Sequence, residues 1–212
     1  MMKFDLLKNG CDSFKIAHEL INQYRIGEEI HDYHLKDIVI YMNHGIEILM
    51  KYILSNKDEV LLFNNIDRYA KARKEMKDKG HTSVFKADSK LHTINLNSAI
   101  ERIEHILDIK IEQELKKHID ELIIVRNELM HYTTELTTRE ALNLVDDLEI
   151  CYELSYEFFA TNIGRDVFES SLEFARRKSS RFNDYLVYRQ EESDKAADAA
   201  IDSYEADRHE QY

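Results

Sequence analysis

The chain has 212 residues, with 5 glycines and no proline, where average usage would give roughly 15 and 11. Because these residues terminate strands and form tight turns, their scarcity argues against a sheet-rich protein and favours long helices with short polar connections. Acidic residues outnumber basic ones 41 to 29, so a protein that grips nucleic acid by its overall charge is disfavoured, and any polyanion must meet a local basic patch.

The two cysteines, Cys11 and Cys151, are too few for a disulfide framework or a structural zinc site. We therefore expect no metal and no cofactor. The first residues do not resemble a secretory leader, so we expect a reduced, cytoplasmic protein. The most apolar stretch, from 35 to 54, is predicted to be a core helix and not a membrane span, because it is interrupted by Lys36, Asp37, His44, Glu47 and Lys51.

Apolar residues recur with helical spacing along the chain, and no stretch shows the alternation of a strand. In chain order the pattern predicts helices over about 13–24, 32–55, 66–79, 97–107, 111–132, 138–162 and 165–189. The second helix is apolar on most of its circumference and is expected to be central, whereas the third is heavily charged and is expected on the surface. The polar connection over 80–97 is expected to be functional or mobile.

The capping residues and the charge of the C-terminal end divide the chain. Asn95 or Asn97 is predicted to begin the fourth helix, and Thr137 or Thr138, with Glu140 in the first turn, the sixth. We expect an all-α bundle over 1–164, a further C-terminal helix over 165–190, and a tail over 191–212. This tail holds 8 acidic and 2 basic residues, so it is predicted to be solvated or frayed.

Arg126 is the starting point for a candidate site. It falls on an apolar stripe that the predicted helix from 111 forms with spacings of three and four, through Leu115, Ile119, Leu122 and Leu129. A guanidinium keeps its charge, so among core positions it needs carboxylate or phosphate partners or a second chain. The alternative is that its stem packs along the stripe while its head reaches water.

The predicted central helix offers a partner for Arg126, because it carries a polar strip of Asn43, His44, Glu47 and Lys51. Buried carboxylates are rarely left unpaired, which suggests that Glu47 meets Arg126. The equally weighted alternative is that Glu47 and Lys51, four residues apart, satisfy each other on a solvent-facing side of the helix.

Asn127 and His131 are also four residues apart, so they share an edge of the helix beside Arg126. An imidazole can act as a general acid or base near neutrality. A cation for developing charge, an amide for positioning and an imidazole for proton transfer together suit chemistry at a phosphodiester.

These residues carry a family resemblance. The segment 126–131, RNELMH, resembles the signature of HEPN ribonucleases, an Arg followed after four to six residues by a His, including the Asn directly after the Arg. The upstream stretch NHGIEILMKYIL resembles the Glu and Lys region of the family, here Glu47 and Lys51, with His44 in the same stretch. The resemblance covers roughly residues 11–162.

The resemblance implies a HEPN-like helical bundle and a metal-independent endoribonuclease. Two copies of the motif would meet across a homodimer interface, with His131 as acid/base, Arg126 as stabiliser of the phosphorane and Asn127 as positioning group. The implied reaction is attack of the RNA 2′-OH on the adjacent phosphate, which leaves a 2′,3′-cyclic phosphate. It also implies a toxin or an RNA-cleaving defence effector, with an antitoxin or regulatory protein as a further partner.

A basic cluster in the last predicted helix offers candidate RNA contacts, with aromatic residues interleaved: Arg176, Arg177, Lys178 and Arg181. A solvated helix face explains the same cluster, since acidic residues lie close on both sides. Two other functions fit the chain as a whole. One is a catalytically idle helical module that dimerises or binds a partner protein, and the other is an acidic inhibitor that mimics nucleic acid.

Overall fold

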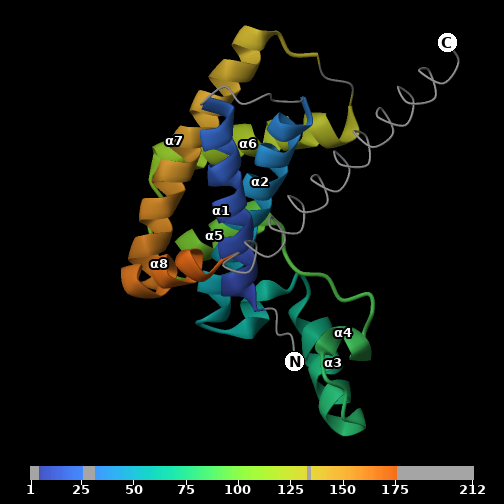
Figure 1. The fold of residues 1–212 in the computed structure, drawn as a ribbon. Helices are drawn as coiled ribbons and strands as arrows, with labels where there is room; N and C mark the ends of the chain where they lie inside the picture. The colour runs from blue at the N-terminus through green and yellow to red at the C-terminus, as the bar shows by residue number, and fades with distance from the viewer. Residues whose placement is uncertain (1–4, 26–31, 133–134, 176–212) are drawn as a thin grey trace, which may run out of the picture. The chain divides into compact units, whose positions relative to one another are not determined.

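Helices make up most of the computed structural model, which describes residues 5–25, 32–132 and 135–175 (Figure 1). The elements are α1 (Leu6–Arg25), α2 (Asp32–Ser55), a 3-10 turn (Glu59–Leu62), α3 (Ile66–Lys79), α4 (Val84–Ala87), α5 (Leu96–His105), α6 (Gln113–His131), α7 (Thr138–Ile163) and α8 (Arg165–Phe174). Within the described ranges there is no strand, only one isolated antiparallel bridge between Phe63 and Thr93. The predicted all-α fold is confirmed.

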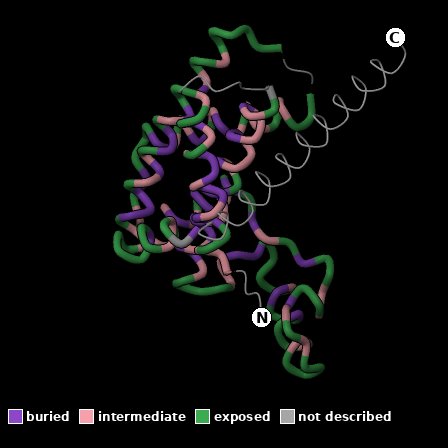
Figure 2. The backbone as a smooth tube through the Cα atoms, viewed as in Figure 1, coloured by how far each residue is buried: buried purple, intermediate pink, exposed green. Residues whose placement is uncertain are grey.

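Helix α2 is central, as its apolar circumference predicted. It packs against α1, α5, α6, α7 and the 3-10 turn, and Figure 2 shows buried residues following one another along it. Its contact with α1 is the most extensive, because glycines let the two helices approach closely. A Cβ at Gly45 would lie 2.8 Å from the backbone nitrogen of Phe14.

An aromatic cluster joins α1, α7 and α8. The ring of Phe14 stacks on Tyr152 with centroids 4.3 Å apart and meets Phe159 edge-on at 5.8 Å. Phe168 of α8 is fully buried against the same rings. Helix α8 begins at Arg165 as predicted and packs on α1 and α7. Residues 176–190 of the predicted C-terminal helix and the tail over 191–212 lie outside the described residues.

Local capping sets several helix ends. Asn95 caps α5, and Thr137 forms a capping box with Glu140 at the start of α7. Helix α3 ends at Gly80, whose φ of 66° favours glycine. The predicted start of the first helix at 13 was wrong: α1 begins at Leu6, because Asp5 accepts a hydrogen bond from the backbone N–H of Lys8.

The charged helix α3 lies on the surface as predicted, with only Tyr69 and Ala72 buried. It packs mainly on α4, a single turn within the predicted connection over 80–97. Arg68 of α3 donates from Nε and Nη2 to the carboxylate of Asp88, with Nη2 at 2.7 Å from Oδ1. This bidentate pair ties the connection to α3.

Candidate active site at the end of helix α6

The apolar stripe of α6 begins in the core and ends at the surface. Leu115, Ile119 and Leu122 are buried where α6 packs on α2 and α7. One and two turns later, Arg126 and Leu129 are only half-buried. The C-terminal part of the stripe is therefore incompletely covered by the protomer's own helices.

The Arg126 guanidinium has a neutral partner. Its Nη1 donates to Oδ1 of Asn127 at 3.1 Å, and no carboxylate in the described ranges lies within ion-pair distance. Neighbouring residues of a helix point roughly 100° apart, so this hydrogen bond draws the guanidinium towards the edge that Asn127 occupies. The remaining guanidinium donors are free to bind an anion.

His131 is the last residue of α6 and is exposed. It lies one turn after Asn127, so both side chains leave the same edge of the helix. The helix ends there because Tyr132 is extended, while its backbone N–H still donates to the carbonyl of Glu128. Arg126, Asn127 and His131 thus lie within the last two turns of one helix, and all three are accessible to solvent.

The supporting residues of α2 are arranged differently from the prediction that paired Glu47 with Arg126. Lys51 Nζ donates to Glu47 Oε1 at 2.6 Å and to Thr93 Oγ1 at 3.2 Å. Lys51 is only 6% exposed, so water cannot stabilise its ammonium and the Glu47 carboxylate must do so. Arg126 is more accessible and needs an ionic partner less. The predicted Glu47–Arg126 pair was wrong. The alternative, in which Glu47 and Lys51 satisfy each other, is confirmed, although Lys51 is buried and not solvent-facing.

His44 is exposed on α2, one turn before the Glu47–Lys51 pair. For the part of the chain that the structure describes, no hydrogen bond or ion pair joins these α2 residues to Arg126, Asn127 or His131. The candidate RNA contacts at Arg176, Arg177, Lys178 and Arg181 lie outside the described residues.

Exposed apolar side chains lie at the end of α6 and around the start of α7, where Figure 2 colours most of the described backbone as exposed. Each is at least 41% exposed, and they are Met130, Tyr132, Leu136 and Leu142. Apolar area facing solvent often marks a contact surface. The signal for such a surface in the sequence is the row of large apolar residues spaced along this otherwise polar segment.

In the described ranges, no three or more His, Cys, Asp or Glu side chains are grouped so that they could hold a metal ion. None of the described helices combines the length and the apolar composition that a membrane span needs. Comparison of the chain with protein-family models, with curated proteins and with solved structures finds no match.

Proposed function

We propose that this chain is a metal-independent endoribonuclease of the HEPN type. The observation that supports the proposal is the accessible set at the end of α6, where Arg126 is hydrogen-bonded to Asn127 and forms no ion pair with a carboxylate of the described residues. A guanidinium with free donors suits the charge that develops on a phosphoryl group. His131 lies on the same edge and supplies a group that moves protons.

The reaction is an intramolecular phosphoryl transfer. The 2′-oxygen loses its proton and bonds to the adjacent phosphorus, the bond from phosphorus to the 5′-oxygen breaks, and the departing 5′-oxygen takes up a proton. His131 transfers protons, Arg126 stabilises the pentavalent phosphorane, and Asn127 holds Arg126 in place. The products carry a 2′,3′-cyclic phosphate and a 5′-hydroxyl.

A homodimer completes the proposed site. Two proton transfers occur at different oxygens, and a two-fold axis near His131 brings two imidazoles to one phosphate. The exposed apolar residues Met130, Tyr132, Leu136 and Leu142 adjoin the site in the chain, and their burial in a dimer interface removes them from water. The same proposal places the protein among toxins or RNA-cleaving defence effectors, restrained by an antitoxin or regulatory protein.

Purified protein incubated with RNA and an excess of chelator tests the chemistry. We expect cleavage, products ending in 2′,3′-cyclic phosphate, and no cleavage of DNA, which lacks the attacking hydroxyl. Cleavage only after addition of magnesium would overturn the proposal.

Sedimentation of the parent and of the double variant Leu136→Asp/Leu142→Asp tests the dimer. We expect a parent dimer and a monomeric variant, because two carboxylates cannot be buried without partners. A parent that is monomeric at micromolar concentration contradicts the composite site. A stable dimer that leaves RNA intact would instead support the catalytically idle binding module.

A further inference from the structure

The region from 66 to 90 is basic in an acidic protein. It contains 8 Lys or Arg residues and 4 Asp or Glu residues, whereas the rest of the chain contains 21 and 37. The negative charge of the rest of the chain therefore repels a polyanion, whereas the positive charge of this region attracts one. The region consists mostly of α3 and α4.

Several of these cations have no anionic partner in the part of the chain that the structure describes. Arg68 is neutralised by Asp88, and Lys79 pairs with Glu75. Arg73 donates instead to the hydroxyl of Tyr69 at 3.2 Å. Lys74 and Lys77 form no ion pair with any residue that the structure describes, and both are exposed. Three neighbouring positive charges on α3 are therefore available to a ligand.

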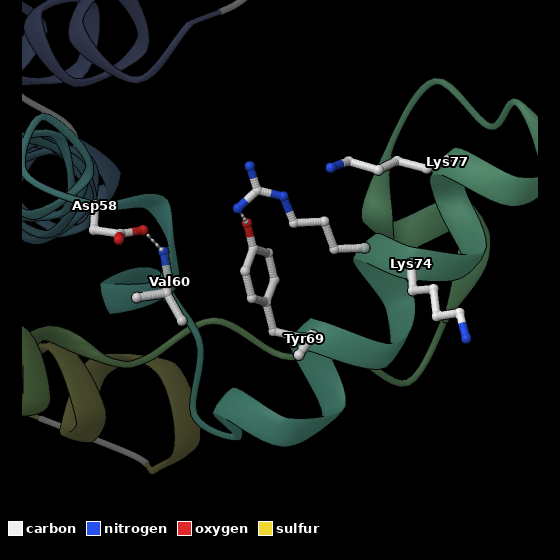
Figure 3. A pocket seen from close by; sticks show the side chains of 7 residues that line it. Asp58, Val60, Tyr69, Lys74 and Lys77 are labelled. Atoms are coloured by element: carbon white, nitrogen blue, oxygen red, sulfur yellow. Dashed lines mark hydrogen bonds between the residues drawn. The ribbon is translucent and has the colours of Figure 1, made fainter.

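The three cations border an open cavity of about 500 Å³, shown in Figure 3. Tyr69 forms one wall, and Asp58 and Val60 of the segment around the 3-10 turn lie opposite. The Tyr69 hydroxyl donates to Glu59 Oε2 at 2.8 Å and accepts from Arg73, which fixes the position of the guanidinium. Only one of the five Arg73 donors is used in this way.

The spacing of the charges fits a polyanion strand. Arg73 and Lys77 lie one turn apart, about 6 Å along the axis, which is comparable with the distance between neighbouring phosphates of a nucleic-acid strand. Three of the seven lining residues are exposed cations, against the single carboxylate of Asp58, so the charge of the lining favours an anionic ligand. The features therefore favour a phosphate backbone.

We infer that α3 binds the sugar–phosphate backbone of the substrate RNA through Arg73, Lys74 and Lys77. The inference rests on the proposed ribonuclease function and adds a substrate-holding surface to it. Helix α3 packs mainly on α4, whereas α6 packs on α2 and α7, so α3 is not among the main packing partners of α6. The RNA held by α3 is therefore a segment at a distance from the phosphate that is cleaved.

The test uses the full chain and a single-stranded RNA with 2′-O-methyl sugars, which keeps the RNA backbone but has no free 2′-OH to attack the phosphate. Its affinity is measured over a salt series for the parent and for Arg73→Gln/Lys74→Gln/Lys77→Gln. Each phosphate contact on a single strand contributes about 0.7 to the slope of log K against log salt, so the slope should fall by about 2. Affinity at low salt should fall at least tenfold.

A matched control removes three other exposed charges, in Lys8→Gln/Lys110→Gln/Lys117→Gln, whose side chains are 70–78% exposed. This variant has the same net charge and should keep the parent slope. Because Arg73 also contacts Tyr69, the double variant Lys74→Gln/Lys77→Gln is the check on folding, and its slope should fall by about 1.4.

Equal losses in the two triple variants would overturn the inference, since only net charge would then matter. Tighter binding of a polyglutamate of matched charge than of RNA would also overturn it. A readout of cleavage separates this result from the proposed function. The α3 variants should raise KM for a long RNA while leaving the rate on a dinucleotide unchanged, whereas RNA that binds to α3 but is never cut would refute the ribonuclease and retain the surface.

Discussion

Helices α2 and α6 each place a cation among apolar residues, but the two cations have different partners. In α2, Lys51 is almost fully buried and is held by Glu47 and by the hydroxyl of Thr93. In α6, the one hydrogen-bond partner of the Arg126 side chain among the described residues is the neutral amide of its neighbour Asn127, and Arg126 remains partly accessible. The charge of Lys51 is thus neutralised within the protein, whereas the charge of Arg126 is available to an anion.

The two helices also differ in what covers their apolar residues. The apolar residues of α2 are covered by α1, α5, α6, α7 and the 3-10 turn, including α1 at a backbone approach that only glycine permits. The C-terminal turns of α6 lead instead into exposed Met130 and Tyr132. An apolar surface without cover beside an unneutralised cation is an arrangement that a second chain and a phosphate would complete, and this is the physical basis of the proposed site.

The largest expected effects concern the end of α6. His131→Ala and Arg126→Ala should each slow RNA cleavage by about 100- to 10,000-fold, because a general acid/base and an electrostatic stabiliser are lost. Initial rates of cleavage under single-turnover conditions measure the effect. Neither change should lower stability by more than about 0.5 kcal/mol, since both side chains are accessible.

His105→Ala is the matched control for this prediction, because His105 is also exposed near a helix end, that of α5. It should cleave RNA at the parent rate. A His131→Ala variant that is as active as the His105→Ala control would show that the end of α6 does not carry the chemistry.

In α2 the charge is structural, so the expected effect is on folding. Glu47→Ala leaves the buried Lys51 ammonium with the Thr93 hydroxyl alone, and we expect a loss of about 2–3 kcal/mol in the free energy of unfolding. The carboxylate is itself 27% exposed, which keeps the loss below that of a fully buried pair.

Urea unfolding of Glu47→Ala and Lys51→Met compares the two ends of this pair. Lys51→Met should cost less, because it leaves a partly hydrated carboxylate and fills the apolar surroundings with a side chain of similar length. Equal costs for the two variants would mean that the pair is not buried in solution.

The close approach of α1 and α2 predicts a smaller effect. Gly45→Ala places a Cβ at 2.8 Å and 2.9 Å from the backbone N and Cα of Phe14, which cannot move aside without moving the helix. Overpacking costs about 1–3 kcal/mol and offsets the gain of about 1 kcal/mol in helix propensity. Thermal unfolding should show a lower Tm.

Gly10→Ala is the control, because its Cβ meets mainly the Leu49 side chain, with Cγ at 2.8 Å and Cδ2 at 2.9 Å. The buried Leu49 side chain can adjust more than the backbone of Phe14, so the loss should be smaller than for Gly45→Ala. A Gly45→Ala variant as stable as Gly10→Ala would show that the α1–α2 contact is looser than the structure indicates.

Much of the fold follows from local patterns in the sequence. The bounds of α2 and α3 could be predicted because apolar periodicity in α2, and the caps Asn65 and Gly80 of α3, act within a few residues. The start of α1 could not, because Asp5 is an inconspicuous cap before an apolar pair. The single turn α4 owes its position to the burial of Val84 and the Arg68–Asp88 pair, which are tertiary contacts.

The candidate site shows the limit of the same reasoning. Periodicity placed Arg126 on an apolar stripe and Asn127 beside His131, because these are relations within one helix. It could not choose the partner of Glu47, since that depends on the height and rotation of helices relative to one another. For a similar reason the sequence does not show which cations of α3 are unpaired: only the tertiary structure shows that Arg68 is neutralised while Arg73 is not.

The smallest expected effect concerns the pair that holds α3 to the connection after it. Hydrogen bonds from the Arg68 guanidinium, and then from the backbone N–H of Lys90, lower the pKa of Asp88 to about 2. A carboxyl whose pKa is depressed by folding stabilises the native state above its unfolded pKa of about 4 and loses that contribution as the pH falls towards 2.

Asp88→Asn should therefore unfold slightly more easily than the parent at pH 7, and the difference should shrink between pH 4 and pH 2.5. A difference in urea midpoint that is the same at pH 7 and pH 2.5 would show that the pair does not form in solution, and α3 would then be held by the Tyr69–Phe63 stack, whose centroids are 4.3 Å apart, without its polar anchor.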